Sequence, residues 1–269
     1  MSAYDAFTTV LARKEGHVLT VSLNRPAQRN AINGEVHAGL REILALAAED
    51  ADVRAIVLRG EGKAFCAGGD VGTMVGAEEG GATSPALGVL STLDATRMID
   101  MLLAVRQPIV CALQGFAMGL GATIALLCDV VVMAEDAVIA DTHVNIGLVA
   151  GDGGAVLWPL LESFAAAKWH LMTGERVNGL DAVRLGLALK AVPAAELDDE
   201  AQRLAARLAQ IAPLAVQGTK ATLNRVIRDR IHLLLETGLL LEGATMVSED
   251  HHEAATAFLG KRPAVFTGR

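Results

Sequence analysis

The sequence predicts an α/β fold in which short strands alternate with helices and pair mainly in parallel. Three observations support this prediction. Strand-like apolar runs alternate with segments of helical periodicity, glycine-rich turns follow several of those runs, and the chain reads as helical from about Ala194 to its end. Hydrophobic residue types make up 52% of the 269 residues, which suffices for a sizeable core and excludes a disordered chain.

The N-terminal third is expected to form a hairpin, a helix, a strand and a second helix. Lys14-Glu15-Gly16 separates two runs of β-forming residues and is therefore read as a hairpin turn. Asn33 is a good N-cap for the helix that follows, because its side chain can accept a backbone hydrogen bond. The stretch 71–91, rich in Gly, Ala, Ser and Thr, is expected to be a mobile loop or lid. The predicted elements are strands over 6–13, 17–24 and 54–59 and helices over 34–50 and 93–105.

The middle of the chain repeats the order strand, glycine turn, helix, strand. We expect one domain of residues 1–194, carrying the functional site, followed by a C-terminal helical region of residues 195–269. The predicted elements are strands over 109–113, 130–133 and 138–140, a helix from about Leu120 to Leu127, a glycine-rich loop over 147–154, an amphipathic helix over 195–211 and a helix beginning at Pro213.

Charge and composition exclude several classes of protein. The 23 basic and 31 acidic residues give a net charge of −8, which argues against a nucleic-acid partner. Residues 107–128 contain no charged side chain, but Pro108, Gln114 and three glycines argue against a membrane-spanning helix, so no membrane partner is expected. Three cysteines without CxxC spacing and an N-terminus without a secretory signal predict a cytoplasmic protein.

Two glycine-rich turns, Ala67–Asp70 and Gly115–Gly121, each follow a predicted strand. Glycine lets a ligand approach the backbone closely, and a helix beginning near Leu120 would direct free N–H groups into the same space. Two N–H groups that converge on one oxygen form an oxyanion hole. The alternative is that these glycines only turn the chain. Neither turn matches GxGxxG or a phosphate-binding GK[ST] loop.

Several motifs in order along the chain carry a resemblance to a known family. They are Asn24-Arg25-Pro26 with Asn30-Ala31-Ile32, Phe65-Cys66-Ala67-Gly68-Gly69-Asp70, Gly115–Gly121 with Cys128-Asp129, Leu171-Met172-Thr173-Gly174, and Phe258-Leu259-Gly260-Lys261-Arg262. With these motifs the chain resembles the crotonase (enoyl-CoA hydratase/isomerase) superfamily over nearly its whole length.

The resemblance implies a crotonase-like spiral core of ββα units and a C-terminal helical region that forms homotrimers, often paired into hexamers. It implies a coenzyme A thioester as substrate and no cofactor beyond that coenzyme A. The family's oxyanion hole would fall on the backbone N–H groups of Ala67 and Leu120. Substrate binding would fall on Ala67, Gly68, Gly69, Asp70, Phe258 and Lys261.

The chain departs from the family at the two positions where hydratases carry catalytic glutamates, which are Thr123 and His143 here. His143 is expected to act as general base, since its ordinary pKa of roughly 6.5 suits proton transfer. Asp152 would hold the imidazole or act on the substrate, and Thr123 would orient a water. The alternative roles are structural: His143 as a hydrogen-bonded core residue and Asp152 as a helix N-cap.

Three functions stay open at this point. The first is an enoyl-CoA hydratase or isomerase that stabilises a thioester enolate. The second is a carbon–carbon hydrolase of β-diketones, because the His143/Asp152 pair also resembles 6-oxocamphor hydrolase. The third is an acyl-CoA binder without catalysis. No metal site is predicted, since His251 and His252 lack a third ligand at matching spacing. Glu236 and Glu242 either line a pocket or form surface ion pairs.

Overall fold

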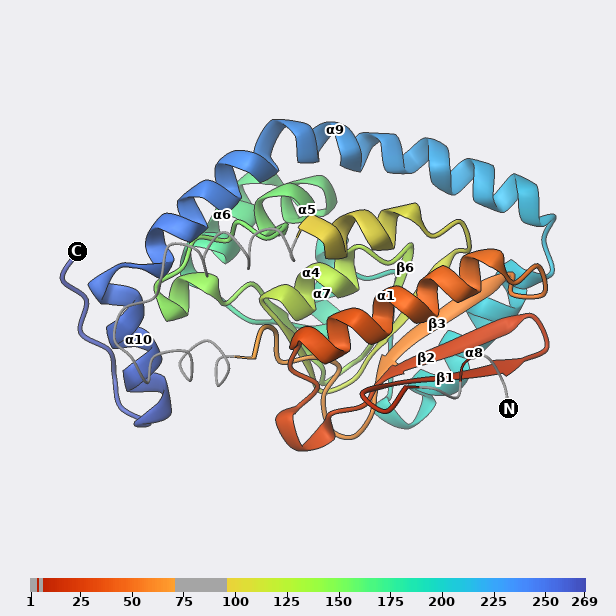
Figure 1. Cartoon of the computed structure of the whole chain (residues 1–269), viewed down its shortest axis with the longest axis horizontal. Helices are drawn as coiled ribbons and strands as arrows, with labels where there is room; N and C mark the ends of the chain where they lie inside the picture. The colour runs from red at the N-terminus through yellow and green to blue at the C-terminus, as the bar shows by residue number, and fades with distance from the viewer. Residues whose placement is uncertain (1–3, 5–6, 71–95) are drawn as a thin grey trace.

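The computed structural model describes residue 4 and residues 7–70 and 96–269, and its largest element is a six-stranded sheet (Figure 1). The first two strands are antiparallel and every other pair is parallel, as the sequence predicts. The strands lie in the order β1 (Val10–Glu15), β2 (Val18–Leu23), β3 (Ala55–Gly60), β4 (Ile109–Leu113), β6 (Val130–Ala134) and β9 (Lys190–Val192).

The structure also contains a second sheet of three short strands. It contains β5 (Phe116–Met118), β7 (Val138–Ala140) and β8 (Val177–Asn178), in that order. Strands β5 and β7 are parallel, and an isolated bridge between Cys66 and Ala117 ties the glycine turn of residues 67–70 to β5. The sequence did not predict β5, β8 or β9, because two or three residues show no apolar alternation.

The helices over 34–49, 120–126, 197–209 and 213–246 follow the predicted positions, whereas those over 154–161, 164–173 and 179–185 are not among the predicted elements. The Asn33 side chain accepts the N–H of Val36 and so caps the first helix, as expected. Residues 96–104 are helical, whereas the predicted lid of residues 71–91 lies outside the described residues. The helices are α1 (Gly34–Glu49), α4 (Leu120–Leu126), α5 (Gly154–Leu161), α6 (Phe164–Thr173), α7 (Gly179–Leu185), α8 (Leu197–Ala209), α9 (Pro213–Met246) and α10 (Glu249–Leu259), with 3-10 turns η1 (Pro26–Gln28), η2 (His143–Ile146) and η3 (Ala194–Glu196).

The C-terminal helices differ in what they cover. Helix α8 packs on the large sheet through four buried residues at helical spacing: Leu197, Ala201, Ala205 and Ala209. The 34-residue helix α9 runs along the top of the molecule in Figure 1 and leads to α10. The expected domain boundary after residue 194 and the expected trimer stay predictions.

Length and hydropathy determine whether any of the described helices could span a membrane. None of them alone is both long and apolar enough to cross a bilayer. Helix α9 and residues Glu249–Phe258 meet the length and composition criteria only together, and the chain bends by 72° between them.

Candidate active site

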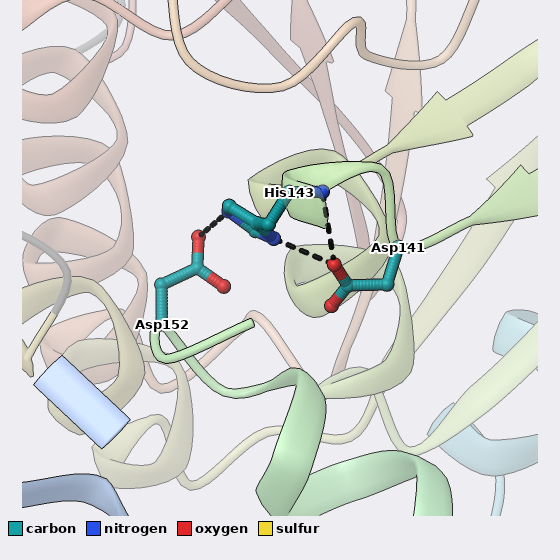
Figure 2. A group of neighbouring side chains, drawn as sticks. All are labelled: Asp141, His143 and Asp152. Carbon is teal, nitrogen blue, oxygen red and sulfur yellow. Dashed lines mark hydrogen bonds and ion pairs between the residues drawn. The ribbon is translucent and has the colours of Figure 1, made fainter. Parts of the chain in front are cut away.

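A buried cluster of one histidine and two aspartates forms the centre of the candidate site (Figure 2). His143 lies between the two carboxylates. Its Nδ1 is 2.6 Å from Oδ1 of Asp141, and its Nε2 is 3.2 Å from Oδ2 of Asp152. The Thr123 hydroxyl donates to the other oxygen of Asp152 at 3.1 Å. The structure therefore brings together the three residues that the sequence predicts as catalytic and adds Asp141 to them.

Separate elements position these side chains. Asp141 directly follows strand β7, and His143 begins the 3-10 turn η2 two residues later. The Asp141 carboxylate also accepts the backbone N–H of His143 at 3.3 Å, which fixes the turn that aims the imidazole. Asp152 lies in the loop before α5, and Thr123 lies on α4. A predicted alternative for Asp152 was helix capping, but Gly153 is the N-cap of α5 and no side chain caps it.

The electrostatics of the cluster favour a charged histidine. Burial by itself lowers the pKa of His143, but attraction to Asp152 and Asp141 and hydrogen bonds to both outweigh burial and raise that pKa well above its ordinary value. The raised pKa favours the imidazolium form of His143 in this site. A protonated imidazole has no free lone pair, which argues against the predicted role of His143 as general base.

Glu242, contributed by α9, is the third acidic residue of this region. Its side chain is buried, and a Cβ added to Gly151 would lie 2.7 Å from its Oε2. Burial first, and then repulsion from Asp152, raise the pKa of Glu242 to about 8. The interpretation of Glu242 as part of a surface ion pair, one of the two that the sequence left open, is therefore wrong. Glu236, in contrast, is exposed.

Glycine 119 places a backbone turn against the cluster. Its φ of +51° is in the left-handed region that favours glycine, and a Cβ at this position would lie 3.4 Å from Cε1 of His143. The next residue, Leu120, is the first of helix α4, where the N–H has no partner within the helix. Among the described residues no acceptor pairs with this N–H, so a donor beside His143 is free for a ligand.

The prediction that the N–H of Ala67 is the second donor of the oxyanion hole is wrong. The N–H of Ala67 donates to the carbonyl oxygen of Arg29 at 3.0 Å, so it is already paired. In the same turn the N–H of Gly68 donates to Sγ of Cys66, and the N–H of Asp70 donates to the carbonyl oxygen of Ile32. Within the described part of the chain, Gly69 is the residue of this turn whose N–H has no acceptor.

The remaining predicted binding residues lie at two places. The Asp70 carboxylate is held by the Arg25 guanidinium at 2.9 Å, at the edge of the described chain. Phe258 and Lys261 are exposed at the end of α10. Helix α10 itself reaches the site region, because Nδ1 of His251 lies 2.6 Å from the carbonyl oxygen of Ile146 in η2. The role of these residues in coenzyme A binding stays a prediction.

The ligand atoms of Asp141, His143 and Asp152 all lie within 4.8 Å of one another, a spacing that can hold a metal ion. The two ring nitrogens of His143, however, face different carboxylates. One ion cannot lie in both gaps, whereas one proton on each nitrogen accounts for both contacts. The geometry therefore favours a protonated histidine over a metal ligand.

Comparison with known proteins identifies the family of the chain. The family model for enoyl-CoA hydratase/isomerase matches residues 13–269. The chain is 31% identical to a probable enoyl-CoA hydratase of Mycobacterium tuberculosis over 270 residues, covering 98% of this chain and 99% of the relative. It is also 31% identical to 1,2-epoxyphenylacetyl-CoA isomerase of Escherichia coli over 260 residues, covering 97% and 98%.

Solved structures give the same result for the fold. An enoyl-CoA hydratase/isomerase from Mycobacterium paratuberculosis has a TM-score of 0.85 and 34% identity, covering 94% of this chain and 99% of that one. A carnitinyl-CoA dehydratase from Mycobacterium avium has a TM-score of 0.83 and 31% identity, covering 97% and 99%. These matches confirm the predicted crotonase fold, and the chain belongs to the enoyl-CoA hydratase/isomerase family.

Proposed function

We propose that this chain adds water to the double bond of a 2-enoyl-CoA thioester, using Asp152 in place of the family's usual glutamate bases. The observation that carries the proposal is the buried Asp152 carboxylate, held by His143 and Thr123, together with the N–H of Leu120, which has no acceptor among the described residues. Acyl-CoA as the substrate class is supported by the relatives, which are named for enoyl-CoA and epoxyphenylacetyl-CoA substrates.

In this proposal the thioester oxygen binds to backbone N–H groups. Leu120 supplies one donor at the start of α4, and Gly69 replaces Ala67 as the second donor. Donors that are already in place stabilise the oxygen as it becomes an enolate, and such a donor typically contributes roughly 10²–10³ in rate. Gly68, Asp70, Phe258 and Lys261 would bind the rest of the thioester. Coenzyme A enters as part of the substrate, and no separate cofactor is invoked.

Asp152 is the base in this scheme. The imidazolium of His143 and the hydroxyl of Thr123 each engage one of its oxygens, which fixes the carboxylate and leaves further lone pairs for a water. The carboxylate takes a proton from that water while the oxygen attacks the β-carbon of the thioester. His143 and Thr123 are thus positioning residues, because they act through Asp152.

The test follows the loss of conjugated thioester absorbance when purified protein is mixed with crotonyl-CoA. Asp152→Asn should reduce kcat by roughly 10²–10⁴-fold, since Asn keeps the shape of the side chain but cannot accept the proton. Asp136→Asn is a matched control, because Asp136 is an exposed aspartate in the turn before β7. An Asp152→Asn protein with full activity would show that the base has been misassigned.

A second candidate is a carbon–carbon hydrolase of β-diketones, favoured by the 3.2 Å separation between His143 and Asp152. This function predicts turnover of a cyclic β-diketone without coenzyme A. Calorimetry with crotonyl-CoA separates the two candidates: a hydratase binds the thioester, whereas the hydrolase does not. Tight thioester binding with no turnover of either substrate would instead support an acyl-CoA binder without catalysis.

A further inference from the structure

Glu242 occupies an unusual place for an acidic residue. It lies near the C-terminal end of the 34-residue helix α9, and its side chain is only 5% exposed. Its Oε2 has no hydrogen-bond partner among the described residues. Burying an unpaired carboxyl group is costly, and surface positions are available on the same helix, as at Glu236. A buried acid that has no structural partner in the described part of the chain and lies next to a cluster of titratable groups indicates a functional role.

The backbone brings this acid to the cluster. Gly151 and Gly238 lie so close that a Cβ added to Gly238 would meet the Gly151 Cα at 3.1 Å. This approach seats α9 directly against the loop that carries Asp152. One turn further along α9, Oε2 of Glu242 lies against Gly151, the residue before Asp152. The charged groups that face Glu242 are Asp152, Asp141 and His143.

Glu242 and Asp152 have contrasting surroundings. Asp152 is engaged by an imidazolium and a hydroxyl, both of which stabilise a carboxylate. The unpaired Oε2 of Glu242 lies in a buried setting, and burial together with repulsion from Asp152 raises the pKa of Glu242 to about 8. Glu242 is therefore a carboxylic acid at neutral pH, whereas both oxygens of Asp152 face a hydrogen-bond donor. Two titratable groups whose environments differ in this way are suited to be the base and the acid of one reaction.

We propose that Glu242 is the second catalytic residue of this site and donates the proton to the α-carbon of the substrate. The proposal rests on the hydration proposed above and completes it. Asp152 takes a proton from water, and the remaining hydroxyl bonds to the β-carbon. The π electrons of the double bond move to form the enolate. Glu242 then protonates the α-carbon and becomes a carboxylate, and the proton on Asp152 returns to Glu242 as the product leaves. One water is added and both groups end as they began.

The decisive variant is Glu242→Gln, which keeps the size and neutrality of the side chain but removes the transferable proton. We expect kcat for crotonyl-CoA to fall by roughly 10²–10⁴-fold with little change in KM. Glu242→Asp, which restores an acid, should recover part of the loss. Glu236→Gln, an exposed glutamate on the same helix, is the matched control and should retain full activity.

The pH profile separates proton donation from a packing role. In the wild-type protein and in Glu236→Gln, kcat should fall at alkaline pH with an apparent pKa near 8, as Glu242 loses its proton. In Glu242→Gln this alkaline limb should be absent. An alkaline limb that persists in Glu242→Gln, or full activity of that variant beside an inactive Asp152→Asn, would overturn the role of Glu242 and leave the hydration proposal standing.

A measurement without substrate completes the test. Infrared difference spectra of wild-type protein against Glu242→Gln should contain the C=O stretch of a protonated carboxyl group that disappears as the pH rises through about 8. Absence of this band at neutral pH would overturn the proposal, whichever substrate the protein uses. Full activity of Asp152→Asn, in contrast, would overturn the hydration scheme on which the proposal rests.

Discussion

Nδ1 of His143 lies 2.6 Å from Oδ1 of Asp141, and the two residues are separated by a single position in the chain. The same carboxylate oxygen accepts the backbone N–H of His143, so side chain and backbone are fixed together. Asp141 is fully buried at the end of β7. It therefore fixes the direction of the ring, and Nε2 is aimed at Asp152.

Asp141→Asn should lower the pKa of His143 toward its ordinary value, because one of the two charges that stabilise the imidazolium is removed. We expect kcat to fall by about 10²-fold or more, as when the orienting carboxylate of a catalytic histidine is lost. An NMR titration of the His143 ring checks the pKa, and crotonyl-CoA turnover checks the rate. Asp136→Asn is again the control. An unchanged titration would contradict the assigned electrostatics.

The raised pKa of His143 also links stability to pH. The folded protein holds this proton more tightly than the unfolded chain does. The resulting stabilisation is therefore full below about pH 6.5 and is lost as pH rises through the raised pKa. Urea unfolding should show that Asp141→Asn weakens this dependence. The loss of stability relative to wild type should be largest at acidic pH and shrink at alkaline pH.

Thr123→Val tests the second partner of Asp152. Valine keeps the shape of threonine but removes the hydroxyl that donates to Oδ1 at 3.1 Å. Loss of this donor to the buried Asp152 carboxylate should lower stability by about 1–3 kcal/mol and should lower kcat at least about tenfold. Thr123→Ser retains a hydroxyl and should retain most of the activity. Equal losses in both variants would show that packing of the threonine methyl group matters more than the hydrogen bond.

The sequence predicts best those features that depend on neighbouring residues. The Asn33 cap and the hairpin around Gly16 follow from local chemistry, and both are confirmed. The wrong assignment of Ala67 has a different origin. Whether the N–H of Ala67 is free depends on the carbonyl of Arg29, which belongs to a segment almost forty residues earlier. A glycine-rich turn shows that some N–H groups are available to a ligand but not which of them are already paired.

For the same reason, the sequence predicted only part of the site. Thr123 and His143 occupy the family's two glutamate positions, Asp152 was predicted from its spacing to His143, and the structure brings the three together. Asp141 was visible two residues before His143, but its role depends on where β7 ends. Glu242 is ninety residues beyond Asp152, and only the path of α9 reveals its proximity. The one sequence signal for it was an acidic residue within an apolar helical stretch.

Glu242→Gln should change stability in a pH-dependent way. The pKa of Glu242 rises from 4.5 to about 8 on folding, so the folded state gains stability from the bound proton below pH 4.5 and loses it as pH rises to 8. This shift corresponds to about 5 kcal/mol at most. Glu242→Gln should be as stable as wild type near pH 4.5. As the pH rises from 4.5 to 8, wild type loses stability and the variant becomes progressively more stable than wild type. A constant difference across this range in urea unfolding would contradict the neutral carboxyl group.

Gly151→Ala tests the close approach between the Asp152 loop and α9. The added Cβ would lie 2.6 Å from the Gly238 carbonyl carbon and 2.7 Å from Oε2 of Glu242, so the helix or the loop must shift. We expect a loss of about 1–3 kcal/mol in stability together with reduced kcat. Gly243→Ala is the control on α9, because among the described residues no atom outside the adjacent helix backbone lies within 4 Å of its added Cβ. That change should stabilise the helix by roughly 0.5–1 kcal/mol.

Leu120→Pro tests the backbone donor of the proposed oxyanion hole. Leu120 is the first residue of α4, where the N–H makes no bond within the helix and proline is well tolerated. Proline therefore removes this one donor while the helical hydrogen bonds of α4 remain. We expect kcat to fall by roughly 10²–10³-fold.

Leu120→Ala is the matched control for this change, because it shortens the same side chain and keeps the N–H. It should retain kcat within about tenfold of wild type, since the donor in the proposed mechanism belongs to the backbone. Circular dichroism of both variants checks that α4 and the sheets persist. If Leu120→Pro folds and hydrates crotonyl-CoA at the rate of Leu120→Ala, the thioester oxygen binds elsewhere. The free N–H beside His143 would then serve another purpose, such as holding the attacking water.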